Sequence, residues 1–230
     1  MILTAHQPCY LPWLGLFHKI ARADRFISFN QVQYQAKDWN NRNQIKTQQG
    51  PIWLSVPVLR KGRLDRNYAD IMINNEVGWR RKHWNSMQSN YSKAPYFKNY
   101  ADYFEDIYAR EWVSLVELNE VMLQWFLDTL GLDRKVESAA DFGFTGEKSE
   151  LVLDMCKKTE AGTYIFGPQG KDYADVAAFE ADGVKVIFDE YQHPQYPQLY
   201  GDFVSHLSIV DLLFNCGGNS LDVLMSRAGS

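Results

Sequence analysis

The sequence contains few cysteines, and they show no pattern. Cys9, Cys156 and Cys216 are odd in number and far apart in a chain of 230 residues. Such spacing favours reduced thiols over a disulfide framework or a zinc motif. We therefore expect three small buried side chains. Cys9 is the exception, because its position near His6 leaves a nucleophilic role open.

Long apolar runs are also missing. No stretch reaches the roughly 18 apolar residues that a membrane span requires. The amino terminus lacks the basic start and the small-residue cleavage site of a signal peptide. The sequence therefore predicts a cytoplasmic protein.

Excess positive charge and clustered metal ligands are absent as well. The formal net charge of -4 gives no general basic surface for nucleic acid, so a small-molecule partner is favoured. The five histidines include no close pair at metal-ligand spacing, although folding could bring His6 and His193 together. No metal site is expected.

The composition itself is that of a globular protein, with 46% hydrophobic and 23% charged residues. We expect a single domain over residues 1–230, with an α/β core from 1–73 and 132–230 and a helical insertion at 75–131. The apolar positions of the insertion suffice for packing on the sheet or on a second copy, so a homodimer stays open.

The first thirty residues predict a βαβ unit. The apolar run 1–5 suits a buried strand that stops at His6, Gln7 and Pro8. A short helix follows Pro12, and a second strand is expected over 25–29. Ligands of open α/β sheets bind beyond the carboxyl ends of the strands. His6, Gln7 and Tyr10 are therefore candidate site residues.

A polar segment follows and leads into a predicted β-hairpin of 43–47 with 52–58. The loop before it carries Lys37, Trp39, Asn41 and Arg42. These side chains could hold a phosphate or a carboxylate, with Trp39 as a stacking face for a ring. An exposed polar hairpin without a ligand explains the same residues.

Helical and α/β patterns alternate in the rest of the chain. We expect a helix over 147–158 capped by Thr145, and strands over 162–166 and 183–188. The loop 167–173 contains two glycines and Lys171, which suits close approach to an anion, but its spacing is not that of a P-loop.

The carboxyl-terminal segment combines an extended loop with an apolar helix. Two prolines make 192–198 extended, which presents His193, Tyr196 and Gln198 as donors and acceptors. A helix predicted over 205–215 would bury almost its whole surface, including Asp211. A buried carboxylate must be paired or protonated, so Asp211 either binds a basic side chain or anchors a loop.

Two segments resemble the WbqC-like family of bacterial proteins. They are His6-Gln7-Pro8 with Tyr10-Leu11-Pro12-Trp13 and Gly15, and the stretch from His193-Pro194 through Asp211 to Gly217. The resemblance spans nearly the whole chain. It implies a setting in O-antigen, and hence lipopolysaccharide, biosynthesis, and a glycine-transferase role.

A more distant resemblance concerns the nucleotidyltransferases, which carry a His-x-Gly-His signature after the first strand. Here the corresponding residues are Trp13, Leu14, Gly15 and Leu16, so both histidines are absent. This resemblance implies a Rossmann-like, mainly parallel sheet. Adenylyl transfer would need His6, Lys37 or Lys171 in place of the missing histidines.

Three functional hypotheses follow. The first is a transferase that places a glycyl or other acyl group on the amino group of a nucleotide-linked amino sugar, with His6 as general base toward the amine or as an activator of the acyl group. The second is an ATP-dependent ligase using Mg²⁺, and the third is a non-catalytic protein that binds a sugar nucleotide or a partner. The candidate catalytic residues are His6, Lys37 and His193, and the candidate substrate-binding residues are Gln7, Tyr10, Trp39, Asn41, Arg42, Lys171, Tyr196, Gln198 and Asp211.

Overall fold

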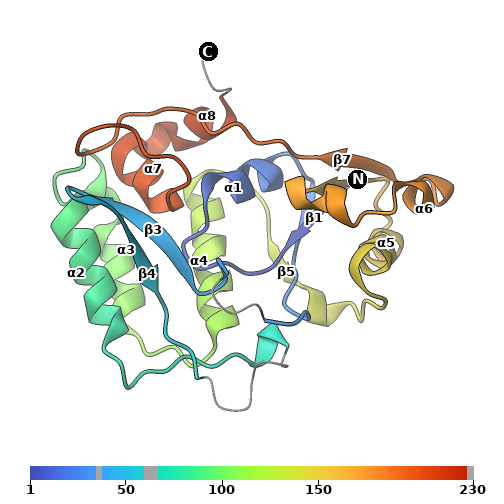
Figure 1. Ribbon diagram of the computed structural model, residues 1–230, viewed down its shortest axis with the longest axis horizontal. Helices are drawn as coiled ribbons and strands as arrows, with labels where there is room; N and C mark the ends of the chain where they lie inside the picture. Colours follow the sequence, from blue (N-terminus) through green and yellow to red (C-terminus); the bar gives the residue numbers. More distant parts are fainter. Residues whose placement is uncertain (35–37, 60–66, 227–230) are drawn as a thin grey trace.

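The computed structural model describes residues 1–34, 38–59 and 67–226. Its centre is a five-stranded, entirely parallel sheet in the order β5-β2-β1-β6-β7 (Figure 1). The strands are β1 (Ile2–His6), β2 (Arg25–Ser28), β5 (Val136–Ser138), β6 (Thr163–Phe166) and β7 (Lys185–Phe188). The α/β class and the mainly parallel sheet are therefore confirmed.

The first strand of the chain, β1, is the middle strand of the sheet, and the later strands are added on both sides of it. From β1 it passes through α1 (Leu14–Ala21) to β2 on one side, and later reaches β5 at that edge. It then returns to the other side of β1 to form β6 and β7. The strand order therefore reverses between β1 and β6, which makes this pair of strands the topological switch point.

Both faces of the sheet are covered because successive strand residues point to opposite sides. Phe26 of β2 belongs to a large apolar cluster with α1 and the helices of the insertion, whereas the adjacent Ile27 belongs to a smaller one with α5 (Lys148–Lys158) and α6 (Val176–Ala181). Figure 1 shows α2–α4 and the hairpin on one side of the molecule and α5 and α6 on the other.

The expected helical insertion consists of α2 (Trp79–Tyr91), α3 (Phe97–Ala109) and α4 (Leu115–Thr129). Ser114 caps α4, because its side chain accepts a hydrogen bond from the Glu117 N–H. Gly131 ends this region with a φ of +73°, a conformation that glycine adopts without strain. These helices share their apolar core with α1, α7 (Ile209–Cys216) and α8 (Ser220–Met225).

The structure differs from the sequence-based expectations at several boundaries. The hairpin consists of β3 (Arg42–Thr47) and β4 (Gly50–Ser55), so its second strand ends before Val56 and Pro57. The last long helix begins at Ile209 rather than Ser205, because the Ser208 side chain caps it by accepting from the Val210 N–H. The edge strand β5 has only three residues and was not anticipated.

A further difference concerns α5, where Glu147, not Thr145, occupies the N-cap position. Gly146 precedes it with a φ of +90°, which turns the chain away from Thr145. Among the described residues, no helix combines the length and apolarity that a membrane crossing needs.

Candidate functional site

A cavity of about 620 Å³ opens at the carboxyl ends of β1 and β6. Strand β1 and the loop after it contribute Ala5, His6, Gln7 and Cys9, while β6 and its following loop contribute Tyr164, Phe166 and the backbone of 167–170. Helix α5 closes one side with Val152 and Met155. The cavity therefore occupies the switch point, where open α/β sheets bind their ligands.

The loop from Gln7 to Pro12 is held in place by buried amides and a tyrosine. The Asn40 side chain donates to Gln7 Oε1 at 2.9 Å, and the Tyr68 hydroxyl donates to the Pro8 carbonyl at 2.7 Å. The Asn43 side chain donates to the Leu11 carbonyl at 2.5 Å. Leu11 has a φ of +47°, which is unfavourable for a side chain with a Cβ and persists only where the surroundings enforce it.

This network gives a role to the side-chain amides of Asn40, just before the hairpin, and of Asn43, within β3. Asn40 and Asn43 use them to fix the loop after β1, and Asn119 of α4 donates to the Asn40 carbonyl at 2.8 Å. The amide-rich segment therefore positions the site. Gln7 remains available to a ligand, because its Nε2 has no hydrogen-bond partner in the described part of the chain.

His6 is held as a neutral imidazole at the edge of the cavity. Its Nδ1 lies 2.8 Å from the Gln7 carbonyl, which can only accept, so Nδ1 carries the proton and Nε2 keeps its lone pair. Burial and, second, the nearby charge of Lys19 lower the pKa of His6 to about 4, against the opposing effect of the Gln7 carbonyl. At neutral pH the side chain is therefore an uncharged proton acceptor.

Lys19 is an unexpected member of the cavity wall. Its side chain is only 4% exposed, and its Nζ donates to the Ala5 carbonyl at 2.9 Å. Burial lowers its pKa to about 8, while the carboxylate of Asp189 and the Cys9 thiol act in the opposite direction. A charged residue in a helix that otherwise buries Leu14, Leu16, Phe17 and Ile20 was the sequence signal that could have revealed it.

Cys9 lines the cavity but is not activated. Burial raises the pKa of its thiol to about 12, and the carboxylate of Asp38 acts in the same direction. The thiol donates to the Gln7 carbonyl at a sulfur–oxygen distance of 3.3 Å. It is therefore protonated at neutral pH and lacks the thiolate that a cysteine nucleophile needs.

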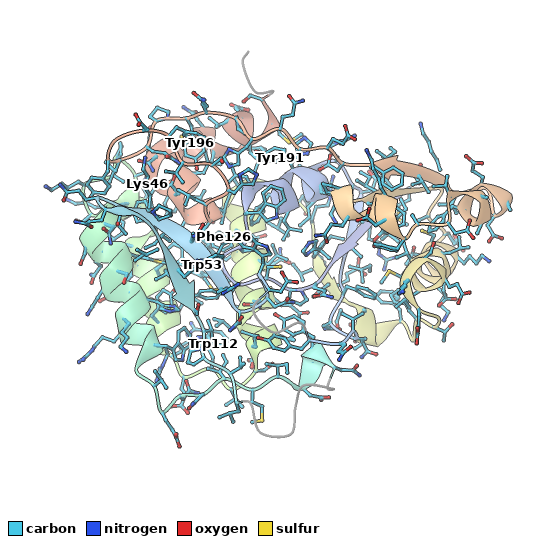
Figure 2. All side chains as sticks on the ribbon, viewed as in Figure 1. Lys46, Trp53, Trp112, Phe126, Tyr191 and Tyr196 are labelled. Atoms are coloured by element: carbon cyan, nitrogen blue, oxygen red, sulfur yellow. The ribbon has the colours of Figure 1, made fainter. Side chains whose placement is uncertain are left out.

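The outer wall of the cavity is aromatic. Trp39 lines it with 39% of its surface exposed, and its ring centre lies 5.4 Å from that of Trp53 on β4. The guanidinium of Arg42 sits 4.4 Å above the Trp53 ring. Trp39 and Trp53, with their ring planes tilted by 48°, and Arg42 thus form a platform that leads from the cavity along the hairpin, and Figure 2 labels Trp53 on the β4 ribbon.

Trp13 and His206 also line the cavity, and their rings are stacked with centres 5.7 Å apart. Trp13 lies across Gly15, where an added Cβ would come within 2.2 Å of the ring. His206 has a φ of +61°. Glycine at position 15 therefore allows the indole to lie flat on α1 at the mouth of the cavity.

Three predicted residues lie at the cavity: His6, Gln7 and Trp39. Lys37 lies outside the described residues. The loop 167–170 lines the cavity as expected, but the exposed Lys171 pairs with Glu190. Lysine at that position therefore neutralises a surface carboxylate.

Tyr10, Asn41 and Arg42 do not line the cavity. Tyr10 is fully buried, and its hydroxyl lies 2.8 Å from Nδ1 of His83 and also contacts Tyr108. The Asn41 side chain donates to the Val56 carbonyl at 2.8 Å. Tyr10 and Asn41 are thus engaged in packing and in the hairpin.

The four carboxyl-terminal candidates gather elsewhere, around the fully buried Asp211. Its carboxylate accepts from Tyr91 at 2.8 Å, Tyr196 at 2.9 Å and Gln198 at 2.8 Å. Burial raises the pKa of Asp211, and the three donors act against that rise. Lys46 donates to Gln198 Oε1 at 3.0 Å and lies with Tyr196 at the same end of the molecule (Figure 2). Asp211 therefore anchors the extended loop.

His193 packs against this cluster and does not line the cavity. Its ring centre lies 6.1 Å from that of Tyr196 and 5.4 Å from that of His206, and its Nδ1 lies 2.9 Å from the Pro194 carbonyl. Within the described ranges, no three histidine, cysteine or acidic side chains are grouped so that they could hold a metal ion.

Comparison with known proteins places these features in a family context. The model of the WbqC-like protein family matches residues 7–223. The uncharacterized protein Rv1507c of Mycobacterium tuberculosis is 36% identical over 220 residues, which cover 95% of each chain. No solved structure matches, so the resemblance to nucleotidyltransferases stays a prediction.

Proposed function

The chain belongs to the WbqC-like protein family, and from that premise we propose that the cavity is the active site of a transferase. The reaction moves a glycyl or other acyl group from an activated donor to the amino group of a nucleotide-linked amino sugar used in surface polysaccharide synthesis. The observation that carries this proposal is His6, a neutral imidazole with a fixed tautomer at the switch-point cavity.

The chemistry requires a proton acceptor that is unprotonated at neutral pH. The amine attacks the acyl carbonyl carbon, a carbon–nitrogen bond forms, and the bond to the leaving group breaks. Nε2 of His6 accepts the proton that the amine nitrogen loses and returns it to the leaving group. The low pKa keeps Nε2 unprotonated, and the donated Nδ1–H keeps that nitrogen directed at the Gln7 carbonyl.

Substrate binding is assigned to the walls. A base or sugar ring stacks on Trp39, and the platform continues to Trp53, where the Arg42 guanidinium offers a cation for a phosphate. The free amide nitrogen of Gln7 donates to a carbonyl or hydroxyl oxygen. A cavity of about 620 Å³ is of the size that accommodates such a ligand.

The test supplies the purified protein with UDP-linked sugars that carry a free amino group. Glycine is offered either as a glycyl thioester without ATP or as the free amino acid with ATP and Mg²⁺. Mass spectrometry should detect a sugar nucleotide heavier by one glycyl residue with the thioester, and His6→Asn should lose the product while remaining folded. Absence of product from every donor would overturn the transferase assignment.

The ATP-dependent ligase is the second candidate, and the strand order supports it. A parallel sheet with a switch point between its first and fourth strands in the chain is the arrangement that binds nucleotides in doubly wound folds. On this reading product forms only with ATP and Mg²⁺, accompanied by release of pyrophosphate or ADP. Stabilisation by a sugar nucleotide without any product would favour the non-catalytic binding protein.

A further inference from the structure

Lys19 is a buried cation without a counterion of its own. Its ammonium group has three N–H donors, and in the described part of the chain only the Ala5 carbonyl accepts from it. No carboxylate among the described residues lies within ion-pair distance of Lys19. The carboxylate that raises the pKa of Lys19 is Asp189, which is already bound by His18 and Arg22.

A lysine with a purely structural role would destabilise the folded protein in this arrangement. Burying an ammonium group costs several kcal/mol unless a partner compensates it, and lysine is rarely buried without one. A lysine that only filled space could be replaced by methionine at no such cost. Lys19 lines the cavity, and so does Ala5, the residue whose carbonyl its Nζ contacts; the ammonium group is thus held against a second lining residue.

We propose that the Lys19 ammonium group binds an anionic oxygen group of the ligand, a carboxylate or a phosphate, inside the switch-point cavity. This assignment rests on the proposed function in that both concern the same cavity. The assignment also specifies the class of substrate, because one of the bound molecules must carry a negatively charged group next to Lys19. Lys171 does not line the cavity, and its ammonium group pairs with Glu190 on the surface.

The groups around Lys19 come from several elements. His6 ends β1, Cys9 lies in the following loop, and Asp189 follows β7. Asp38 also lines the cavity and is exposed. His6 and Cys9 are uncharged at neutral pH, which leaves Asp189 and Asp38 as the only neighbouring carboxylates among the described lining and contacting residues.

The experiment measures binding of two matched pairs of probes by calorimetry in phosphate-free buffer. Uridine monophosphate is compared with uridine to test a phosphate, and glycine with glycinamide to test a carboxylate. The anionic member of at least one pair should bind wild type more tightly, by about 10-fold to 100-fold, the effect expected of a charge-assisted hydrogen bond. The pair that shows the preference identifies the anion.

In Lys19→Met this preference should disappear. The matched control is Lys157→Met, because Lys157 lies on the outer surface of α5 in an ion pair with Asp182 and outside the cavity wall; this variant should keep the preference. If neither anion is preferred by wild type, or if folded Lys19→Met retains the preference, the proposal is wrong.

A measurement on wild type alone guards against a variant that does not fold. With a pKa of about 8, Lys19 is roughly half protonated at pH 8, and a bound anion favours the charged form. Binding should therefore take up to roughly half a proton per ligand, measured in two buffers of different ionisation enthalpy. Binding without proton uptake at pH 8 would overturn the proposal. Anion binding through Lys19 without acyl transfer would refute the proposed function and leave this inference standing.

Discussion

Removing the buried charge of Lys19 should make the protein more stable. Burial lowers the pKa of this side chain from 10.5 to about 8. Each pH unit of such a displacement corresponds to about 1.4 kcal/mol, so the charged side chain costs the folded state about 3 kcal/mol at neutral pH. Lys19→Met removes this cost and loses one hydrogen bond to the Ala5 carbonyl, worth about 1 kcal/mol. We expect a gain of about 2 kcal/mol in the free energy of unfolding at pH 7.

The pH dependence of the free energy of unfolding of wild type is a second test of whether Lys19 destabilises the folded protein. Between pH 8 and 10.5 the unfolded chain retains the lysine proton that the folded protein has released. The unfolded state then binds more protons, so the stability contributed by this residue rises with pH across that window. The advantage of Lys19→Met over wild type should therefore shrink between pH 8 and 10.5.

The assay is urea denaturation followed by tryptophan fluorescence in buffers without phosphate, with Lys157→Met as the surface control. Lys157 is half exposed and should change the free energy of unfolding by less than about 1 kcal/mol. The reasoning is refuted if Lys19→Met loses stability at pH 7 while the control does not. That result would mean that the folded protein already compensates the ammonium group.

Three further predictions concern the surroundings of the site. Asp211→Ala leaves the buried hydroxyls of Tyr91 and Tyr196 without their acceptor and removes one of the two acceptors of the Gln198 amide. It should lower the free energy of unfolding by about 3–5 kcal/mol in urea, whereas the exposed Asp222→Ala should not; equal effects would contradict the anchoring role. Gly15→Ala should displace the Trp13 ring, because its Cβ would lie 2.2 Å from that ring. It should therefore change tryptophan fluorescence and cost about 1–3 kcal/mol. Gly162→Ala is the control, since nothing lies within 4 Å of the added atom, and an unchanged Gly15→Ala spectrum would show that the ring does not lie there. Cys9 should react slowly with a disulfide reagent at pH 8 in the native state and rapidly in urea, because its thiol pKa is about 12 when folded; fast native labelling assigned to Cys9 by mass spectrometry would contradict that pKa.

The fold was predictable from the sequence where the pattern is local. Alternating strands and helices predicted the parallel sheet, and the stop at Pro8 marked the end of β1. The three-residue β5 was missed because it is too short to carry a periodic signal, and it is a strand only through its pairing with β2. The late start of α7 was missed because the Ser208 cap prevails over the apolar pattern around it.

The site was less predictable, because it depends on which side chains the topology brings together. His6 and Gln7 follow a strand directly, and the rule for strand ends placed them at the cavity. Tyr10 belongs to the same loop, but the Tyr10 ring is buried in the core, next to a left-handed backbone conformation at Leu11. The sequence also could not show that Asp211 would meet two tyrosines and a glutamine instead of a basic side chain.

The most direct test of the central claim is an NMR titration of the histidine ring nitrogens with a UDP-linked amino sugar. The account predicts a protonated Nδ1 and a pKa near 4 for His6, and a shift of its Nε2 signal when the ligand binds. His83 provides an internal control, because it also has a pKa of about 4 but is buried against Tyr10 away from the cavity, and its signals should stay unchanged. Binding that leaves the His6 signals unmoved, or a His6 pKa near 6.5, would contradict the assignment of this cavity as the active site.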